Sequence, residues 1–326
     1  MNEGTKRPLR RDTACTETSA TSATSATSAA VTIAGALVFA LALAPAGIHA
    51  QEATAPASAP HDAAPLPADF SKVAREPATQ QARWLRSAAQ QGTLAKLDDA
   101  TLTALFTALD PLAVPEYIRT GPNGYSSYQF TMRRQERISG KWSDTADHMI
   151  VKTTRDPLRV YAKWLPDGAH AGQEIIYDAT LRKDEMYGHL GGLLGKLPLW
   201  TAIDGALARA QSNHQVRDLG TEFIANLYLS EGKKYRDAGV ERPTHVEAKT
   251  VDGVRVVALT YETPTGRPQF YAKKEILGLD LHAPYFRTVE SYDNDGRVFE
   301  RIVIEKIAPA TLDDTAFDPK NPDYRF

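Results

Sequence analysis

Hydrophobic and polar positions follow two different periods along this chain, and the change of period divides it into regions. Between residues 68 and 112 the apolar side chains recur every three or four positions, which predicts amphipathic helices interrupted at Pro77. Asp98 or Asp99 can cap the second of these helices. We therefore expect an N-terminal helical segment over residues 68–112.

From Tyr125 onwards, apolar and polar residues alternate with a period of two. Tyr128, Phe130 and Met132 alternate with polar residues, which is typical of a strand with one buried face. Proline, glycine and aspartate separate the strands that follow, so we expect an antiparallel meander. The strands are predicted at residues 125–138, 148–154, 158–165, 174–179, 254–262, 269–277, 285–292 and 299–307.

Two helices are predicted inside this run of strands. Residues 199–210 and 218–235 have apolar side chains at helical spacing, within an insertion at about residues 191–236. Residues 117–326 are thus expected to form one antiparallel sheet domain. The predicted fold class is α+β: a curved, incomplete antiparallel β-barrel with helices on its concave side, in addition to the N-terminal helical segment.

The first 50 residues have the pattern of a secretory signal peptide. Basic residues at positions 6–11 precede an apolar run at positions 30–44, and a small residue, Ala50, follows. We predict cleavage between Ala50 and Gln51 and a periplasmic location. An uncleaved membrane anchor is the alternative, although the apolar run is short of the about 20 residues that span a bilayer.

Composition changes this picture in two ways. The single cysteine, Cys15, precedes the apolar run, whereas a lipoprotein carries its lipidated cysteine directly after that run, so we predict that the protein is not a lipoprotein. Residues 51–67 consist mainly of alanine, proline, serine and threonine, which predicts a disordered linker.

Charge and motifs exclude several functions. The leader holds four basic and three acidic residues, so the remainder carries a net charge of about −3, which argues against binding nucleic acid. The glycine-rich residues 191–197 lack the Ser or Thr of a phosphate loop. The histidines show no metal-binding spacing, and Ser230 with Lys233 lacks the partner motif of penicillin-recognising enzymes. We therefore expect no cofactor, no metal and no catalytic residues.

Charged and aromatic residues within the predicted strands are the remaining candidates for a site. They could line a cavity or its rim and contact a ligand. The structural alternative is that the aromatic residues pack in the core and the charges pair across strands. The candidate ligand-binding residues are Tyr128, Phe130, Arg137, Tyr161, Lys163, Trp164, Glu174 and Tyr177.

Three of these strands carry a family resemblance. Residues 128–137 (YQFTMRRQER), 156–164 (DPLRVYAKW) and 172–178 (GQEIIYD) resemble an uncharacterised family of exported bacterial proteins. That family is similar in build to the periplasmic lipoprotein carriers LolA and LolB and to outer-membrane lipoprotein-sorting proteins. The resemblance covers roughly residues 117–307. It implies an incomplete antiparallel barrel closed by helices around an apolar cavity that holds acyl chains.

We consider three functions. The leading hypothesis is an exported, non-catalytic periplasmic protein that binds an apolar or lipidated small molecule in a concave sheet cavity. The second is an envelope hydrolase whose site assembles only in space, and the third is a protein-interaction module of the cell envelope. The expected partners are the apolar or lipidated ligand and, transiently, the membrane or envelope proteins.

Overall fold

The computed structural model describes residues 67–119, 125–192, 197–263 and 270–326. The predicted signal peptide, its cleavage site at Ala50 and Gln51, and the predicted linker up to residue 66 lie outside the described residues. No helix in the described ranges has the length and hydropathy needed to cross a membrane.

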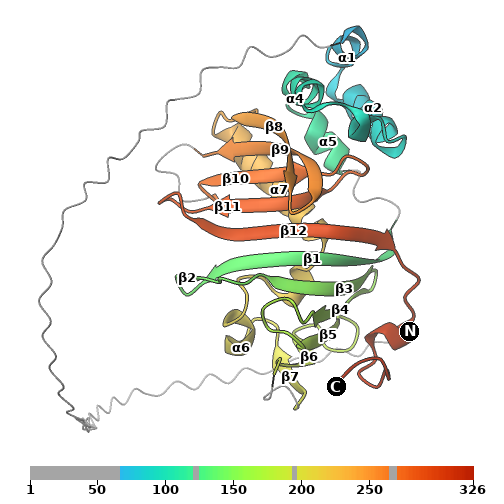
Figure 1. Cartoon of the computed structure of the whole chain (residues 1–326), viewed down its shortest axis with the longest axis vertical. Coiled ribbons are helices and arrows are strands. Elements are labelled where there is room, and N and C mark those ends of the chain that lie inside the picture. Colours follow the sequence, from blue (N-terminus) through green and yellow to red (C-terminus); the bar gives the residue numbers. More distant parts are fainter. Residues whose placement is uncertain (1–66, 120–124, 193–196, 264–269) are drawn as a thin grey trace, which may run out of the picture. The chain divides into compact units, whose positions relative to one another are not determined.

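One open antiparallel sheet forms the body of the protein (Figure 1). Its two longest strands, β1 and β12, lie side by side at the centre; β3 to β7 extend the sheet on one side and β11 to β8 on the other. Within the described residues the strands are β1 (Ser127–Ile138), β2 (Lys141–Trp142), β3 (Asp147–Arg155), β4 (Leu158–Trp164), β5 (Glu174–Asp178), β6 (Glu185–His189), β7 (Leu199–Ala202), β8 (His245–Val251), β9 (Val254–Glu262), β10 (Lys274–Leu279), β11 (Phe286–Tyr292) and β12 (Val298–Pro309). The predicted fold class, an α+β protein built on an incomplete antiparallel sheet, is confirmed.

The helices fall into an N-terminal group and a group inserted between β7 and β8. They are α1 (Ala68–Val73), α2 (Ala78–Gln90), α3 (Thr93–Lys96), α4 (Asp99–Ala108), α5 (Ala113–Arg119), α6 (Ala206–Arg209) and α7 (Thr221–Asp237). The chain breaks between α1 and α2 at Pro77, as predicted, and Asp98 caps α4 by accepting a hydrogen bond from the Thr101 backbone amide. Helix α4 packs on β8, and α7 lies behind the sheet in Figure 1.

The predicted helix over residues 199–210 is wrong for its first half. Leu199–Ala202 form strand β7, which pairs with β6, and only Ala206–Arg209 are helical. The apolar spacing fits a helix, but pairing with the open edge of β6 outweighs this local preference. Strands β2, β6 and β8 were not predicted, whereas the predicted helix over residues 218–235 is confirmed by α7.

The layer between α7 and the sheet is tightly packed. Tyr128, Phe130 and Met132 of β1 all point into it and are buried. Three cavities that α7 borders hold only about 20 Å³ each, roughly the space of a single water molecule. The concave side is therefore filled by side chains in this conformation.

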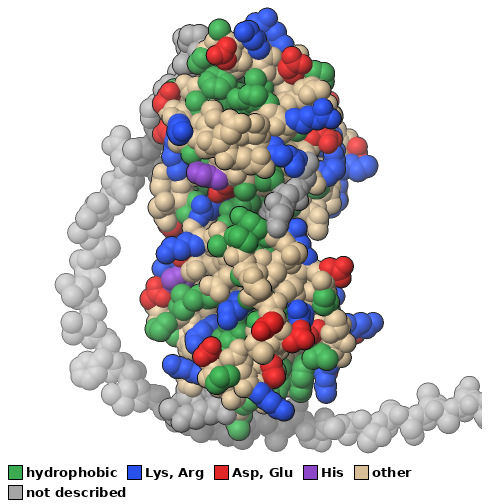
Figure 2. Space-filling view, turned by 90° about the vertical axis from the view of Figure 1, so that its right-hand side faces the viewer, with side chains coloured by type: hydrophobic (Ala, Val, Ile, Leu, Met, Phe, Trp, Pro, Cys, Tyr) green, Lys and Arg blue, Asp and Glu red, His purple; other side chains and the backbone are tan. Residues whose placement is uncertain are grey.

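The opposite face of the sheet is partly covered by the C-terminal segment. Tyr324 stacks on Tyr161 of β4 with ring centroids 3.9 Å apart, and Phe317 packs into the same small cluster. The side of the molecule in Figure 2 shows acidic and basic side chains interspersed, with no large area of one sign.

Candidate functional site

A row of carboxylates crosses the α7-facing surface of the sheet. Glu136 of β1 lies opposite Glu300 of β12, Glu300 lies opposite Ser291 of β11, and Ser291 lies opposite Glu275 of β10. The three glutamates are only 3–5% exposed. We call Glu136, Glu300, Ser291 and Glu275 the carboxylate row.

The neighbouring row, two residues away along each strand, is almost entirely apolar. There Arg134 of β1 lies opposite Ile302, which is followed across the sheet by Val289 and Leu277. Because side chains alternate between the faces of a strand, residues two apart share a face. Two neighbouring rows on the same face of the sheet therefore differ sharply: one is an apolar core, and the other is a cluster of buried charges.

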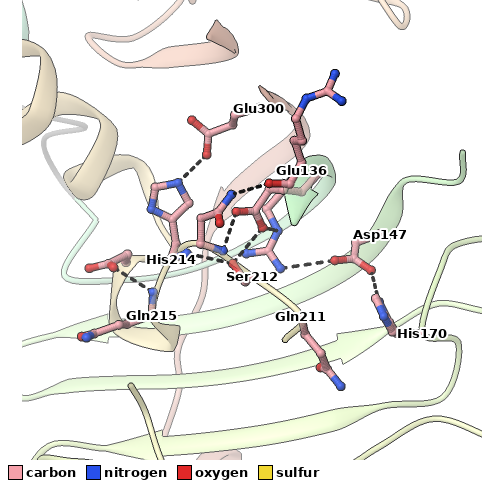
Figure 3. Close-up of polar contacts among 12 residues, drawn as sticks. Glu136, Asp147, His170, Gln211, Ser212, His214, Gln215 and Glu300 are labelled. Carbon is pink, nitrogen blue, oxygen red and sulfur yellow. Dashed lines mark hydrogen bonds and ion pairs between the residues drawn. The ribbon is translucent and has the colours of Figure 1, made fainter. Parts of the chain in front are cut away.

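Arg134 is the central cation of this cluster. Its guanidinium forms ion pairs with Glu136 (Nε–Oε2, 3.1 Å) and with Asp147 of β3 (Nη2–Oδ2, 3.2 Å). All three side chains are buried, and buried charges are tolerated only when they are paired. Asp147 also binds the imidazole of His170 (Oδ1–Nδ1, 2.7 Å), as Figure 3 shows.

The loop before α7 supplies the other side of the cluster. Ser212 Oγ donates to Glu136 Oε2 at 2.7 Å, and the Asn213 backbone amide donates to Glu136 Oε1 at 2.9 Å. The next residue, His214, is hydrogen-bonded through Nε2 to Glu300 Oε1 (Figure 3). Tyr271, from the segment before β10, donates to the other oxygen of Glu300 at 3.0 Å.

The contacts shift the pKa values of these groups in different directions. Burial disfavours the charged form of His214, but its hydrogen bond to Glu300 and the negative charges of Glu300 and Glu136 together outweigh this and raise the imidazole pKa. Burial likewise works against ionised Glu300, whose pKa is nevertheless lowered by its contacts with His214, Tyr271 and Arg134 together. The hydrogen bond that His170 donates to the Asp147 carboxylate raises the pKa of His170. These pairs favour a charged imidazole next to a charged carboxylate.

Glu275 is different, because its carboxyl forms no hydrogen bond or ion pair within the described part of the chain. Burial raises its pKa to about 8, and the nearby carboxylates of Glu231 and Glu300 add to this effect. Glu231 itself, on α7, pairs with Lys234 at 2.6 Å. Glu275 is therefore protonated at neutral pH.

An open cleft of about 390 Å³ borders one end of the cluster. Arg134, Glu136, Asp147 and His170 line it on one side, together with the β1–β2 turn and residues 210–211. Its volume lies in the range of small-molecule sites. The described charges thus reach from solvent, through the cleft, to the buried carboxylate row.

The sequence-predicted ligand residues lie in three different places. Tyr128, Phe130, Trp164 and Tyr177 are in the main core on the α7 side. Tyr161, Lys163 and Glu174 are on the opposite face, where Glu174 accepts from the Tyr161 hydroxyl at 3.1 Å and pairs with Lys163 at 3.2 Å. Arg137 donates to the Val298 carbonyl and lies over the Trp142 ring.

The structure therefore does not bring these eight residues together. Only Phe130 borders a cavity shared with the charged cluster, the small one that Arg134 and His214 also line. None of the eight is among the residues that line the 390 Å³ cleft. Their role in ligand binding stays a prediction.

Sequence reasoning missed Glu275, Glu300, Asp147, His170 and His214 as members of one cluster. The sequence does contain a signal for the two glutamates. Glu300 lies two positions from the apolar Ile302, and Glu275 two positions from the apolar Leu277, so each glutamate points to the same face of its strand as an apolar residue. A charged residue on the buried face of a predicted strand is unusual. The histidines, in contrast, lie on loops and have no such local signal.

Comparison with known proteins identifies a family. The family model described as "Protein of unknown function (DUF1571)" matches residues 125–326. No curated protein matches this chain.

Three solved structures of other proteins are examples of those to which this chain is similar. A putative outer membrane lipoprotein-sorting protein domain from Vibrio parahaemolyticus is 14% identical over 64% of this chain and 95% of its own, with a TM-score of 0.31. The Mycobacterium tuberculosis lipoprotein LppX is 13% identical over 62% and 98%, with a TM-score of 0.33. A LolA superfamily protein from Nitrosomonas europaea is 10% identical over 64% and 98%, with a TM-score of 0.28.

The matched region contains the whole sheet, α7 and every residue of the charged cluster. The expected membership in a family without an assigned function is confirmed, because the match to the family model covers more than half of the sequence. This chain belongs to the DUF1571 family of proteins of unknown function.

Proposed function

We propose that this protein is a non-catalytic binding protein of the cell envelope whose ligand is amphipathic. The polar group of the ligand occupies the 390 Å³ cleft, and its apolar part lies between α7 and the sheet. One observation carries the proposal: Arg134 lines both the cleft and the small cavity beneath α7. The polar and apolar regions therefore adjoin at a single side chain.

The apolar side suits a hydrocarbon chain. The cavity beneath α7 is bordered by Phe130, Met132, Phe223 and Ile224, and a second cavity continues along the helix past Leu227 and Leu277. Each buried methylene contributes about 0.8 kcal/mol. Since these cavities hold about 20 Å³ each, a chain can enter only when α7 moves away from the sheet.

The start of α7 is the part of the helix that such a movement must release. The helix follows Gly220, which has a φ of 147° and provides no side-chain cap. A glycine adopts this conformation without the strain that other residues would incur. In place of a side-chain cap, the Thr221 backbone amide donates to the Tyr128 hydroxyl at 3.3 Å, and Glu222 pairs with Arg155, so these contacts must break when the helix moves.

The polar side suits a neutral or zwitterionic group. Arg134, which lines the cleft, is already paired with Glu136 and Asp147. Its positive charge is therefore already balanced and does not favour the binding of a free anion. Hydrogen-bonding side chains such as His170 and Lys141 also line the cleft. A headgroup that both donates and accepts hydrogen bonds fits this lining.

Native mass spectrometry tests the proposal. We expect the purified protein to carry one amphipathic molecule, either from the cells or after incubation with phosphatidylethanolamine vesicles. Replacing Ile224 by Trp fills the cavity beneath α7 and should abolish loading. The matched control is Asn226→Trp on the exposed side of the same helix, which should load normally. A protein that stays empty in both conditions, or loads equally in both variants, contradicts the proposal.

One observation favours an envelope hydrolase as a second candidate. His170 and Asp147 form a hydrogen-bonded pair at the mouth of the cleft, as a general base and its orienting carboxylate do. Among the described residues, no hydroxyl or thiol is hydrogen-bonded to this imidazole to act as nucleophile. Hydrolysis of a panel of p-nitrophenyl esters that His170→Gln abolishes would support this candidate over simple binding.

A further inference from the structure

We infer that Glu136, His214 and Glu300 form a binding site for a divalent transition-metal ion such as Zn²⁺. One carboxylate oxygen from each glutamate and one imidazole nitrogen lie within 4.8 Å of one another. Imidazole and carboxylate are common ligands of Zn²⁺, with metal–ligand distances of about 2.0–2.2 Å. A modest closure of the three side chains therefore brings them into coordination distance. The inference does not rest on the proposed amphipathic ligand.

The two carboxylate ligands are held in place by neighbouring donors. Glu136 accepts from Ser212 Oγ and from the Asn213 backbone amide, and Glu300 accepts from Tyr271 and, at 3.4 Å, from Ser291. Metal-ligating carboxylates are typically oriented by hydrogen bonds of this kind. The ligands come from β1, β12 and the loop before α7, so that an ion would join the centre of the sheet to the segment that leads into the helix.

The charge balance of the cluster favours a cation. The carboxylates of Glu136, Glu300 and Asp147 carry three negative charges, against one positive charge on Arg134 and one on His170 when it is protonated, while the ligand His214 is neutral in its metal-binding form. The negative charge that is left attracts a divalent ion. In binding, it replaces the hydrogen bond between His214 and Glu300, and any proton on the imidazole is released to solvent.

Glu275 provides an independent observation. Its side chain is 4% exposed, forms no hydrogen bond or ion pair within the described ranges, and lines the same small cavity as Glu300 and Tyr271. A buried carboxyl without a partner is costly, which calls for an explanation beyond packing. Across the shared cavity, the oxygens of this carboxyl would face a cation held by Glu300.

The ion has a route to the site. Glu136 lines the open cleft, so that one of the three ligands can be reached from solvent. His214 and Glu300 lie beside Glu136, on the side away from Asp147 (Figure 3). The ion can thus enter through the cleft without unfolding the sheet.

A second histidine–carboxylate cluster on the other face of the same strands provides a matched control. There His148 binds Asp167 (Nδ1–Oδ1, 2.7 Å) and Glu305 (Nε2–Oε2, 3.1 Å). Arg133 pairs with both of these carboxylates, at 3.1 and 2.8 Å. The chemistry is similar, but His148 contacts its two carboxylates through opposite ring nitrogens, so that one nitrogen does not lie close to both, and Asp167 is more exposed than the carboxylates of the proposed site.

Isothermal titration of the tag-free, chelator-treated protein with Zn²⁺ tests the inference. We expect one equivalent to bind, and His214→Gln and Glu300→Gln to weaken binding by at least about tenfold. Glu305→Gln should bind as the wild type does. Ca²⁺, which requires six to eight oxygen ligands, should bind more weakly than Zn²⁺.

A spectroscopic measurement on the wild type covers the case in which a variant fails to fold. Co²⁺ bound by imidazole and carboxylates at low coordination number gives a visible spectrum more intense than that of the aqua ion, and Zn²⁺ should displace it. The inference is overturned if Co²⁺ shows only the aqua spectrum, if no equivalent of Zn²⁺ binds, or if folded His214→Gln and Glu300→Gln bind Zn²⁺ unchanged.

Discussion

The two halves of strand β1 place different kinds of side chain on the same face of the sheet, apolar in the first half and charged in the second. In the first half, Tyr128, Phe130 and Met132 pack beneath α7 as an ordinary core. In the second half, Arg134 and Glu136 occupy equally buried positions but are charged. The first half needs only apolar residues of the correct size, whereas the second requires specific partners from β3, β12 and the loop before α7. The comparison separates the part of the strand that stabilises the fold from the part that bears the candidate site.

The largest effect is expected from the apolar half. Phe130→Ala removes a side chain that is 1% exposed and leaves a cavity, which should lower the free energy of unfolding by about 4 kcal/mol. Gln129→Ala, on the exposed side of the same strand, should change it by less than about 0.5 kcal/mol. Urea denaturation of the two variants measures both values. A similar loss in the two would mean that β1 does not have the burial pattern described.

The charged half should respond somewhat less. Arg134→Met leaves Glu136 and Asp147 without their cation, a change that costs about 3 kcal/mol. We expect the low end of the usual range because Glu136 keeps its hydrogen bonds from Ser212 and Asn213.

Arg133→Met is the matched control for this variant. Arg133 is the next residue in the strand, points to the opposite face and is one-third exposed, so its ion pairs should contribute about 1 kcal/mol or less. Urea denaturation of both variants, at the same pH and ionic strength, gives the comparison. Equal losses would contradict the assignment of Arg134 as the central cation of a buried cluster.

The sequence predicts the first half of β1 far better than the second. Alternation of Tyr128, Phe130 and Met132 with polar residues is a local pattern, and the structure confirms the strand and its buried face. The cluster around Arg134 depends on register between strands that are distant in sequence, such as Glu136 with Glu300. Local periodicity does not contain that register. The sequence-predicted site residues are accordingly scattered over two faces of the sheet.

Strand β7 illustrates the same limit in the fold. Residues 199–202 have helical spacing, but their backbone pairs with β6, a strand that was not predicted. A segment next to an open sheet edge can gain more from pairing than from its own helical preference. This error, like the scattered site, arises from contacts between residues that only the folded chain brings together.

The carboxylate row should make stability depend on pH. The folded-state pKa of Glu275 is raised by burial to about 8, from an ordinary value of 4.5. The stabilising contribution of the protonated form is therefore complete below about pH 4.5 and is lost as the pH rises toward 8. Between pH 6 and pH 7 the free energy of unfolding should fall by about 1 kcal/mol through this group alone.

Glu275→Gln tests this dependence. A glutamine has similar size and no proton to lose, so the variant should show a weaker decline between pH 6 and pH 7 and be more stable than the wild type at pH 8. Denaturation with the metal chelated, over this pH range, provides the measurement. A decline as steep as that of the wild type would mean that Glu275 is already ionised in the folded protein.

The smallest effect is expected at the mouth of the cleft, where the cluster meets solvent. The hydrogen bond that His170 donates to Asp147 raises the pKa of His170. This pair therefore stabilises the fold below about pH 6.5, and its contribution is lost as the pH rises through the folded-state pKa. Because 42% of the His170 side chain is exposed, screening by water limits the effect of His170→Gln to about 0.5 kcal/mol. An NMR titration of the imidazole should give a pKa above 6.5 in the wild type and a lower one in Asp147→Asn, whereas equal values would remove His170 from the charged cluster. The cluster would then end at Arg134 and Asp147, and the contrast between the two halves of β1 would be confined to its buried residues.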